Sequence, residues 1–106
     1  MDLRKLFIVE TAARLGPVLA ALDFVGPEVI GDAGEYPALL TLRWRRGSAV
    51  AETVLVQAYG GEEYVRTELV DGTGEPTAVG QDTVRNARQL RAALDRHASR
   101  VGAAPR

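Results

Sequence analysis

Residues 38–70 read ALLTLRWRRGSAVAETVLVQAYGGEEYVRTELV, and this stretch decides the fold. It contains three segments rich in Val, Leu, Thr and aromatic residues, at 38–45, 49–59 and 64–70. Glycines stand at the joints between them, at Gly47 and at Gly60-Gly61. Short β-branched and aromatic segments separated by glycine turns are typical of hairpins. The stretch therefore predicts a three-stranded antiparallel meander.

The turns set which side chains face each other. Gly60-Gly61 favours a two-residue type I′ turn, which needs positive φ at both positions and pairs Val56 with Val65. In the first hairpin, a two-residue loop at 46–47 pairs Leu40 with Thr53, whereas a three-residue loop at 46–48 pairs Leu40 with Val54. A shift of one residue moves every side chain to the other face. We expect the three-residue loop because it gathers the apolar side chains on one face, namely Leu40, Leu42, Trp44, Val50, Val54, Val56 and Val65.

Helical periodicity precedes the sheet. Residues 3–14 carry apolar side chains at helical spacing, with Asp2 as a candidate N-cap. Gly16-Pro17 interrupts this pattern, so 17–22 is either a kinked continuation or a second short helix. The apolar stripe of the first segment is Leu3, Leu6, Phe7, Val9, Ala13 and Leu15.

The strongest helical pattern follows the sheet, at 83–101. Asp82 or Thr83 is its candidate N-cap, and Gly102 ends it. Its apolar stripe is Val84, Ala87, Leu90, Leu94, Ala98 and Val101. His97 falls on the polar side of this helix and is expected at the surface. Asp95 and Ser99 cannot form a triad with it, because side chains two apart on a helix diverge.

These elements predict an α+β domain with the order α-β-β-β-α and both helices on one sheet face. The Gly- and Pro-rich segment 26–37 reads as an acidic loop that could hold a short strand at 28–30, and 71–79 reads as a turn-rich loop. We expect a single domain at 1–101 and a flexible tail at 102–106.

The composition excludes several classes of chemistry. The 106 residues include no Cys and one His, which removes disulfides, thiolate nucleophiles, Cys-ligated zinc and multi-His metal sites. We therefore expect no metal and no cofactor. No apolar run approaches the roughly 18 residues of a membrane span, and the N-terminal apolar run is too short for a signal peptide. A cytoplasmic protein without a membrane partner is the resulting expectation.

The net charge of −1 hides an asymmetry. Residues 1–79 hold seven basic and twelve acidic side chains, whereas 80–106 hold six Arg against two Asp. An acidic body suits a basic protein partner. We therefore expect binding rather than catalysis, by a regulator, an adaptor or a toxin-neutralising protein that contacts another protein or a second copy of itself. The candidate partner-binding residues lie on the less apolar sheet face and in the acidic turn, at Arg43, Gln57, Tyr64, Arg66, Glu62 and Glu63.

Two alternatives stay open. A small-molecule or catalytic pocket between sheet and helices would be lined by Tyr36, Trp44 and Tyr59. A basic helix face for nucleic acid, the less favoured partner, would use Arg85, Arg88, Arg96 and Arg100. The α-β-β-β-α order is similar to that of double-stranded-RNA-binding domains, but Gln81, Asp82 and Thr83 stand where those domains carry a basic cluster.

Overall fold

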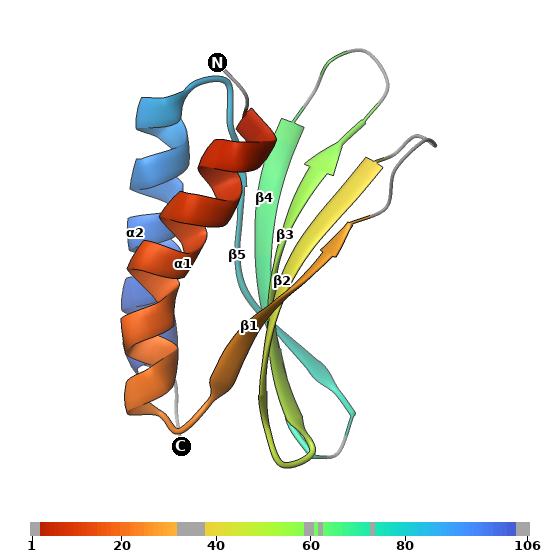
Figure 1. Ribbon diagram of the computed structural model, residues 1–106, viewed down its shortest axis with the longest axis vertical. Coiled ribbons are helices and arrows are strands. Elements are labelled where there is room, and N and C mark those ends of the chain that lie inside the picture. The colour runs from red at the N-terminus through yellow and green to blue at the C-terminus, as the bar shows by residue number, and fades with distance from the viewer. Residues whose placement is uncertain (1–2, 32–37, 59–60, 62, 73, 104–106) are drawn as a thin grey trace.

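The computed structural model describes residues 3–31, 38–58, 61, 63–72 and 74–103 (Figure 1). Two helices enclose five strands in the chain order α-β-β-β-β-β-α. The elements are α1 (Leu3–Ala21), β1 (Val25–Gly31), β2 (Ala38–Arg46), β3 (Ala49–Gln57), β4 (Glu63–Val70), β5 (Pro76–Thr83) and α2 (Ala87–Ala103).

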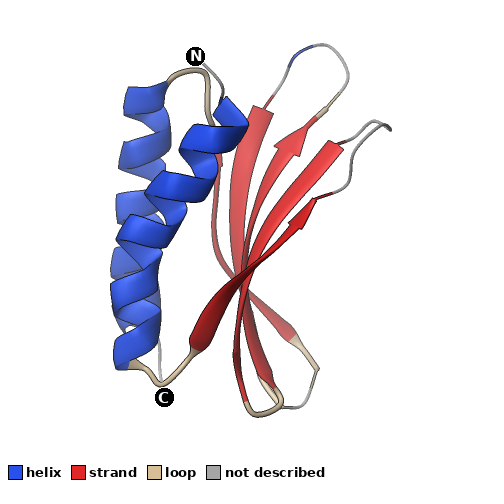
Figure 2. Cartoon of the chain, viewed as in Figure 1, coloured by secondary structure: helices blue, strands red, loops and turns tan. Residues whose placement is uncertain are grey.

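The strands form one antiparallel meander in the order β1-β2-β3-β4-β5. Both helices pack against each other and against the same face of this sheet (Figure 2). We call the face under the helices the inner face and the opposite one the outer face. The prediction of an α+β domain with helices on one sheet face is confirmed. The prediction of three strands is wrong, because β5 was missed and β1 forms over Val25–Gly31, where only a possible short strand at 28–30 was expected.

The two additional strands are edge strands, which explains why the sequence pattern revealed β1 only in part and β5 not at all. In β1 only Ile30 is half-buried, so the strand shows no alternation of apolar and polar residues. Strand β5 begins with Pro76, contains Gly80 and has no fully buried side chain. Edge strands need little burial because one side of each carries no neighbour. Segment 71–79 therefore read as a loop, and segment 26–37 read as a loop with a possible short strand at 28–30.

The predicted register is wrong by one residue in both hairpins. Leu40 pairs with Leu55 rather than Val54, because Arg46 pairs with Ala49 across a turn at Gly47-Ser48. In the second hairpin Val65 pairs with Leu55, so the predicted pairing with Val56 is wrong. Since a shift of one residue exchanges the faces, strand β3 is turned over relative to the prediction. Ala51, Thr53 and Leu55 face the helices, while Val50, Glu52, Val54 and Val56 lie on the outer face.

Helix α1 is one continuous helix with Pro17 inside it, which answers the question left open by the sequence. Its buried residues recur every four positions, at Phe7, Thr11, Leu15 and Leu19. Two members of the predicted stripe are exposed instead, Val9 and Ala13. The predicted N-cap Asp2 lies outside the described residues.

Helix α2 begins at Ala87 rather than at 83, because β5 extends through Thr83. Asn86 caps it: its Oδ1 accepts a hydrogen bond from the Gln89 amide at 2.9 Å. In return Gln89 Oε1 accepts one from the Arg85 amide at 2.8 Å. Side-chain capping of this kind satisfies amides that have no partner within the helix. The helix also runs through Ala103, so its predicted end at Gly102 is wrong, and residues 104–106 lie outside the described residues.

The core lies between the helices and the inner face. Its largest fully buried side chains include Trp44, Phe7, Leu42, Leu55 and Leu94. An ion-pair network joins the helices at the surface, where Glu10 meets Arg14 Nε at 2.9 Å and Arg91 Nε at 3.1 Å. Hydrogen bonds from Arg14 and Arg91 lower the pKa of Glu10. This network links α1 to α2 at the surface.

Candidate functional site

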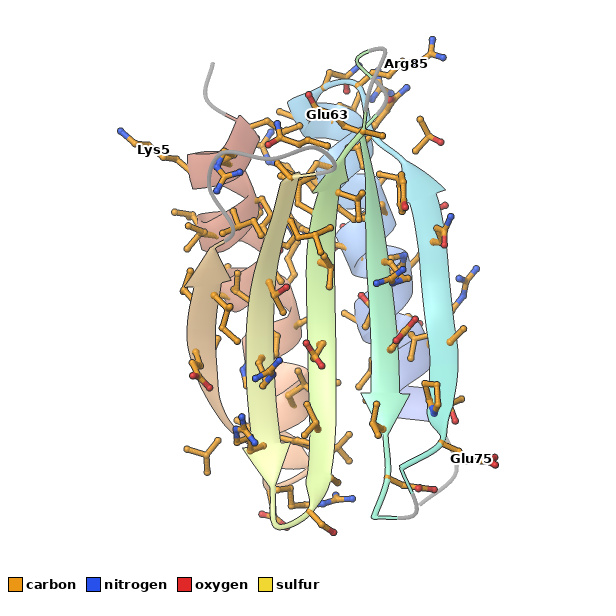
Figure 3. All side chains as sticks on the ribbon, turned by 90° about the vertical axis from the view of Figure 1, so that its right-hand side faces the viewer. Lys5, Glu63, Glu75 and Arg85 are labelled. Atoms are coloured by element: carbon orange, nitrogen blue, oxygen red, sulfur yellow. The ribbon has the colours of Figure 1, made fainter. Side chains whose placement is uncertain are left out.

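Within the described part of the chain, no helix covers the outer face of the sheet (Figure 3). Its centre is apolar, at Thr41, Val54 and Val56, whose exposed fractions are 9%, 7% and 3%. Neighbouring side chains on the same face produce this burial, because both helices lie on the inner face. Tyr64 pairs with Val56 at one end of the face. The result is a tightly packed apolar centre at an open surface.

Charged side chains surround this centre in pairs of opposite sign. Arg43 lies 3.2 Å from Glu52, Arg66 lies 3.2 Å from Glu68, and Arg45 lies 3.7 Å from Glu28. Glu52 and Glu68 are direct cross-strand neighbours, and like charges in that position repel. The adjacent guanidinium groups offset the repulsion. A mostly polar hollow of about 70 Å³ lies between these charged side chains, and it is lined by Glu52, Val54, Arg66 and Glu68.

The structure places the predicted partner-binding residues on two different faces. Arg43, Tyr64 and Arg66 lie half-buried on the outer face, as predicted. Gln57 points to the inner face, where its Oε1 accepts a hydrogen bond from Arg4 of α1 at 3.1 Å, so the prediction that it shares a sheet face with Tyr64 is wrong. Glu63 pairs with Gln57 at the upper end of β4 (Figure 3). Glu62 lies outside the described residues.

The structure places the residues of the two alternative sites in different surroundings. Trp44 is 1% exposed and belongs to the core, while Tyr36 and Tyr59 lie outside the described residues, so the predicted aromatic pocket has no accessible described member. On the basic helix face Arg85 precedes α2, and Arg88 is exposed on its first turn. Arg96 and Arg100 turn back to β5, where Arg96 pairs with Asp82 at 3.0 Å and Arg100 donates to the Val79 carbonyl at 3.1 Å.

The prediction that His97 lies at the surface is wrong, since the side chain is fully buried. A chain of hydrogen bonds passes through it: Thr53 to Thr67 at 2.9 Å, Thr67 to His97 Nδ1 at 2.7 Å, and His97 Nε2 to Asp82 at 2.8 Å. Strand β5 supplies Asp82 and covers this side of α2. Gly80 leaves room for the ring, because a Cβ at Gly80 would lie 2.6 Å from two imidazole atoms.

Burial determines the protonation state of the hydrogen-bonded His97 and Asp82 side chains. Desolvation lowers the pKa of His97 below its usual value and outweighs the opposing effect of Asp82, while Arg100 and Arg96 lower it further. Burial raises the pKa of Asp82, but hydrogen bonds from His97 and Arg96 lower it by more. At neutral pH the imidazole is therefore neutral, with Nε2–H donating to the Asp82 carboxylate. Nδ1 then accepts from the Thr67 hydroxyl, which in turn accepts from Thr53.

We expect the stability of the fold to decrease as the pH falls below about 6.5, the pKa of an ordinary histidine. The unfolded chain binds a proton there that folded His97 excludes, so the free energy of unfolding rises with pH up to that value and is constant above it. One such proton gives a slope of at most about 1.4 kcal/mol per pH unit. His97 is the one histidine of the chain, which makes the assignment direct.

The measurement is urea unfolding from pH 5 to pH 8, followed by the fluorescence of Trp44. The control is His97→Phe, which removes the titrating group and should flatten the profile between pH 5.5 and 8. A wild-type profile that is already flat over this range would contradict the pKa shift. Below about pH 4 the protonation of Asp82 lowers the free energy of unfolding further. The reason is that the pKa of Asp82 is also lower in the folded chain than in the unfolded chain.

The order hydroxyl, imidazole, carboxylate also occurs in nucleophilic catalysis. Here Thr67 is 1% exposed and His97 is 0% exposed, so a substrate has no access to the hydroxyl. This series of hydrogen bonds is structural, because it provides partners for polar atoms inside the core. His97 could have been found from the sequence, because it follows Ala93 and Leu94 at helical spacing and precedes Val101 by four residues.

Comparison with protein-family models, with curated proteins and with solved structures finds no match for this chain. Among the residues that the structure describes, no three His, Asp or Glu side chains gather into a group that could hold a metal ion. Neither of the two helices is long and apolar enough to cross a membrane. The function must therefore be argued from the surfaces of the chain itself.

Proposed function

We propose that this chain is a protein-binding module that uses the outer face of its sheet, and that the partner seated there is a second copy of the chain. The observation that carries the proposal is the charge pattern of this face. Three arginines, Arg43, Arg45 and Arg66, are balanced by three glutamates, Glu28, Glu52 and Glu68, around the apolar centre. A partner with one sign of charge gains nothing from such a face.

A face with alternating charges is complementary to its own copy. In a two-fold dimer the same patch serves both subunits, so each contact between residues i and j occurs twice. A two-fold axis near Val54 brings Glu52 of one copy toward Arg66 of the other. The hollow beside Val54, which charged side chains line, is then available for a polar side chain of the partner. Tyr and Arg, which interfaces enrich, are present at Tyr64, Arg43 and Arg66.

The edges of the sheet are less suited to association than its outer face. Strand β1 contains Pro27 and a register shift between Val25 and Glu28. Strand β5 starts at Pro76, and its pairing with β4 shifts between Thr67 and Glu68. Proline and bulges at edge strands prevent pairing with another chain. The open face is therefore the better docking surface.

The size of the face suits a reversible dimer. Five strands about 4.8 Å apart and about 27 Å long give a face of roughly 650 Å². A stable interface buries about 800 Å² on each partner. We therefore expect a weak, reversible dimer, near the small end of specific interfaces.

The experiment is sedimentation velocity from about 1 to 500 µM on the wild type, Glu52→Arg and Arg66→Glu. The wild type should dimerise, and each variant alone should associate at least tenfold more weakly, because two Arg–Arg or two Glu–Glu contacts replace attractive ones. A mixture of the two variants should dimerise again, since all crossed contacts are then of opposite sign. The matched control is Arg88→Glu on the exposed side of α2, which should dimerise like the wild type.

Thermal unfolding of each variant shows that the monomer remains folded. A wild type that stays monomeric to 500 µM overturns self-association. Equal weakening by Arg88→Glu overturns the outer face as the interface, because the effect would then follow net charge. Failure of the mixture to recover overturns the two-fold arrangement.

A further inference from the structure

An apolar cavity of about 290 Å³ lies at the end of the molecule opposite the start of α2. Leu22 and Phe24 from the α1–β1 connection and Val101 of α2 form one wall. Ala49 of β3 and Leu69 of β4 form the other wall. We call this space the lower cavity. It is separate from the apolar centre and charged pairs of the outer face.

The lower cavity follows from the different lengths of the two layers. Helix α1 ends at Ala21, and the chain reverses at Asp23, which has a φ of 68°. Strands β2 and β3 continue to the turn at Gly47-Ser48, and the twist of the sheet carries their ends away from the helices (Figure 1). No helix covers this end of the inner face among the described residues. An open apolar space is the result.

One cation is fixed at the rim of the lower cavity. Arg46 Nη1 donates a hydrogen bond to the Leu22 carbonyl at 2.8 Å, and the guanidinium lies 4.7 Å from the centre of the Phe24 ring. These contacts hold the group in place and use one of its five N–H donors within the described part of the chain. A guanidinium held in this way is prepared for a carboxylate, which it binds in a two-pronged geometry.

Two other polar residues line the lower cavity. Asp71 has an interaction of its own, and its carboxylate disfavours an anion placed close to it. Thr77 carries no charge. An anionic group is therefore attracted to Arg46, while the remaining walls of the cavity favour apolar groups.

We propose that the lower cavity binds a small apolar carboxylate, with its hydrocarbon part between Phe24, Leu69 and Val101 and its carboxylate on Arg46. A cavity of about 150 Å³ holds one benzene ring. The lower cavity is about twice as large, which leaves room for a ligand of roughly ten to twelve non-hydrogen atoms. Octanoate, with ten, is a suitable probe.

The experiment is a titration of the ¹⁵N-labelled full chain with octanoate, 1-octanol and octylammonium, followed by amide chemical shifts. Octanoate should bind saturably in the submillimolar range and shift the amides of Leu22, Phe24 and Leu69. Octylammonium, which has the same tail and the opposite charge, should bind at least tenfold more weakly. Shifts spread over the whole chain, or equal affinity for the two charged probes, would overturn the proposal.

Two variants test the roles of the head and the tail. Arg46→Leu should weaken octanoate at least tenfold and leave 1-octanol within about twofold, because leucine still covers the Phe24 ring. Ala49→Leu, which fills part of the cavity, should weaken both probes. The matched control is Arg88→Leu, an exposed arginine on the first turn of α2 that lines neither the lower cavity nor the outer face, and it should bind octanoate like the wild type. Equal loss in the Arg88 and Arg46 variants overturns the assignment of the head group to Arg46.

Discussion

Replacing His97 with alanine is expected to lower the free energy of unfolding by about 3–5 kcal/mol. The imidazole is fully buried and hydrogen-bonded at both nitrogens, to Thr67 at 2.7 Å and to Asp82 at 2.8 Å. Alanine leaves a cavity and removes the partners of a hydroxyl and a carboxylate inside the fold. Domains of this size are stable by about 5–15 kcal/mol, so the change removes a large share of the total.

The measurement is urea unfolding followed by Trp44 fluorescence, at pH 7. Ser99→Ala is the matched control, because Ser99 is exposed on the same helix two residues away, and its effect should stay within about 0.5 kcal/mol. The direction in which these hydrogen bonds are donated adds a second test. Thr67→Val should cost more than Thr53→Val, because Thr67 is the group that donates to His97. If His97→Ala lowers the free energy of unfolding by less than about 1 kcal/mol, the hydrogen bonds of His97 contribute little to stability.

The central strands were predictable because their signals are local. Glycine turns and β-branched segments identify β2, β3 and β4 without knowledge of any other element. The register was not predictable in the same way, since both faces of β3 are apolar: one carries Val50, Val54 and Val56, the other Ala51 and Leu55. Counting the larger valines selected the wrong face. The inner face takes the smaller Ala51 because it lies opposite the bulky Trp44.

The error at His97 follows from the missed strand β5. A histidine between Arg96 and Ala98 looks exposed if nothing covers that side of α2. With β5 in place, the same side chain meets Asp82 and the surface left by Gly80. The charge pattern of the outer face was hidden for a related reason. Arg43 and Glu52 become neighbours only in the correct register, so the pairing that supports self-association could not be derived from a register shifted by one residue.

Gly80→Ala is expected to lower the free energy of unfolding by about 2–3 kcal/mol. The added Cβ would lie 2.6 Å from Cδ2 and Nε2 of His97 and 2.8 Å from a guanidinium nitrogen of Arg100. The ring has no free space to move into, because it is fully buried and hydrogen-bonded on both sides. Gly16→Ala is the matched control. A Cβ added at Gly16 has no atom within 4 Å, and Gly16 lies inside α1. Gly16→Ala should therefore raise the free energy of unfolding by up to about 1 kcal/mol.

A double-mutant cycle then separates the clash from any general effect of alanine in β5. In the His97→Ala background the ring that Gly80→Ala meets is gone, and the second substitution should cost less than about 0.5 kcal/mol. The coupling between the two sites is then about 2 kcal/mol, in the range found for residues in direct contact. Additive losses would show that Gly80 is needed for the backbone of β5 rather than for the ring. The coupling energy therefore decides whether the glycine is present to admit the buried histidine.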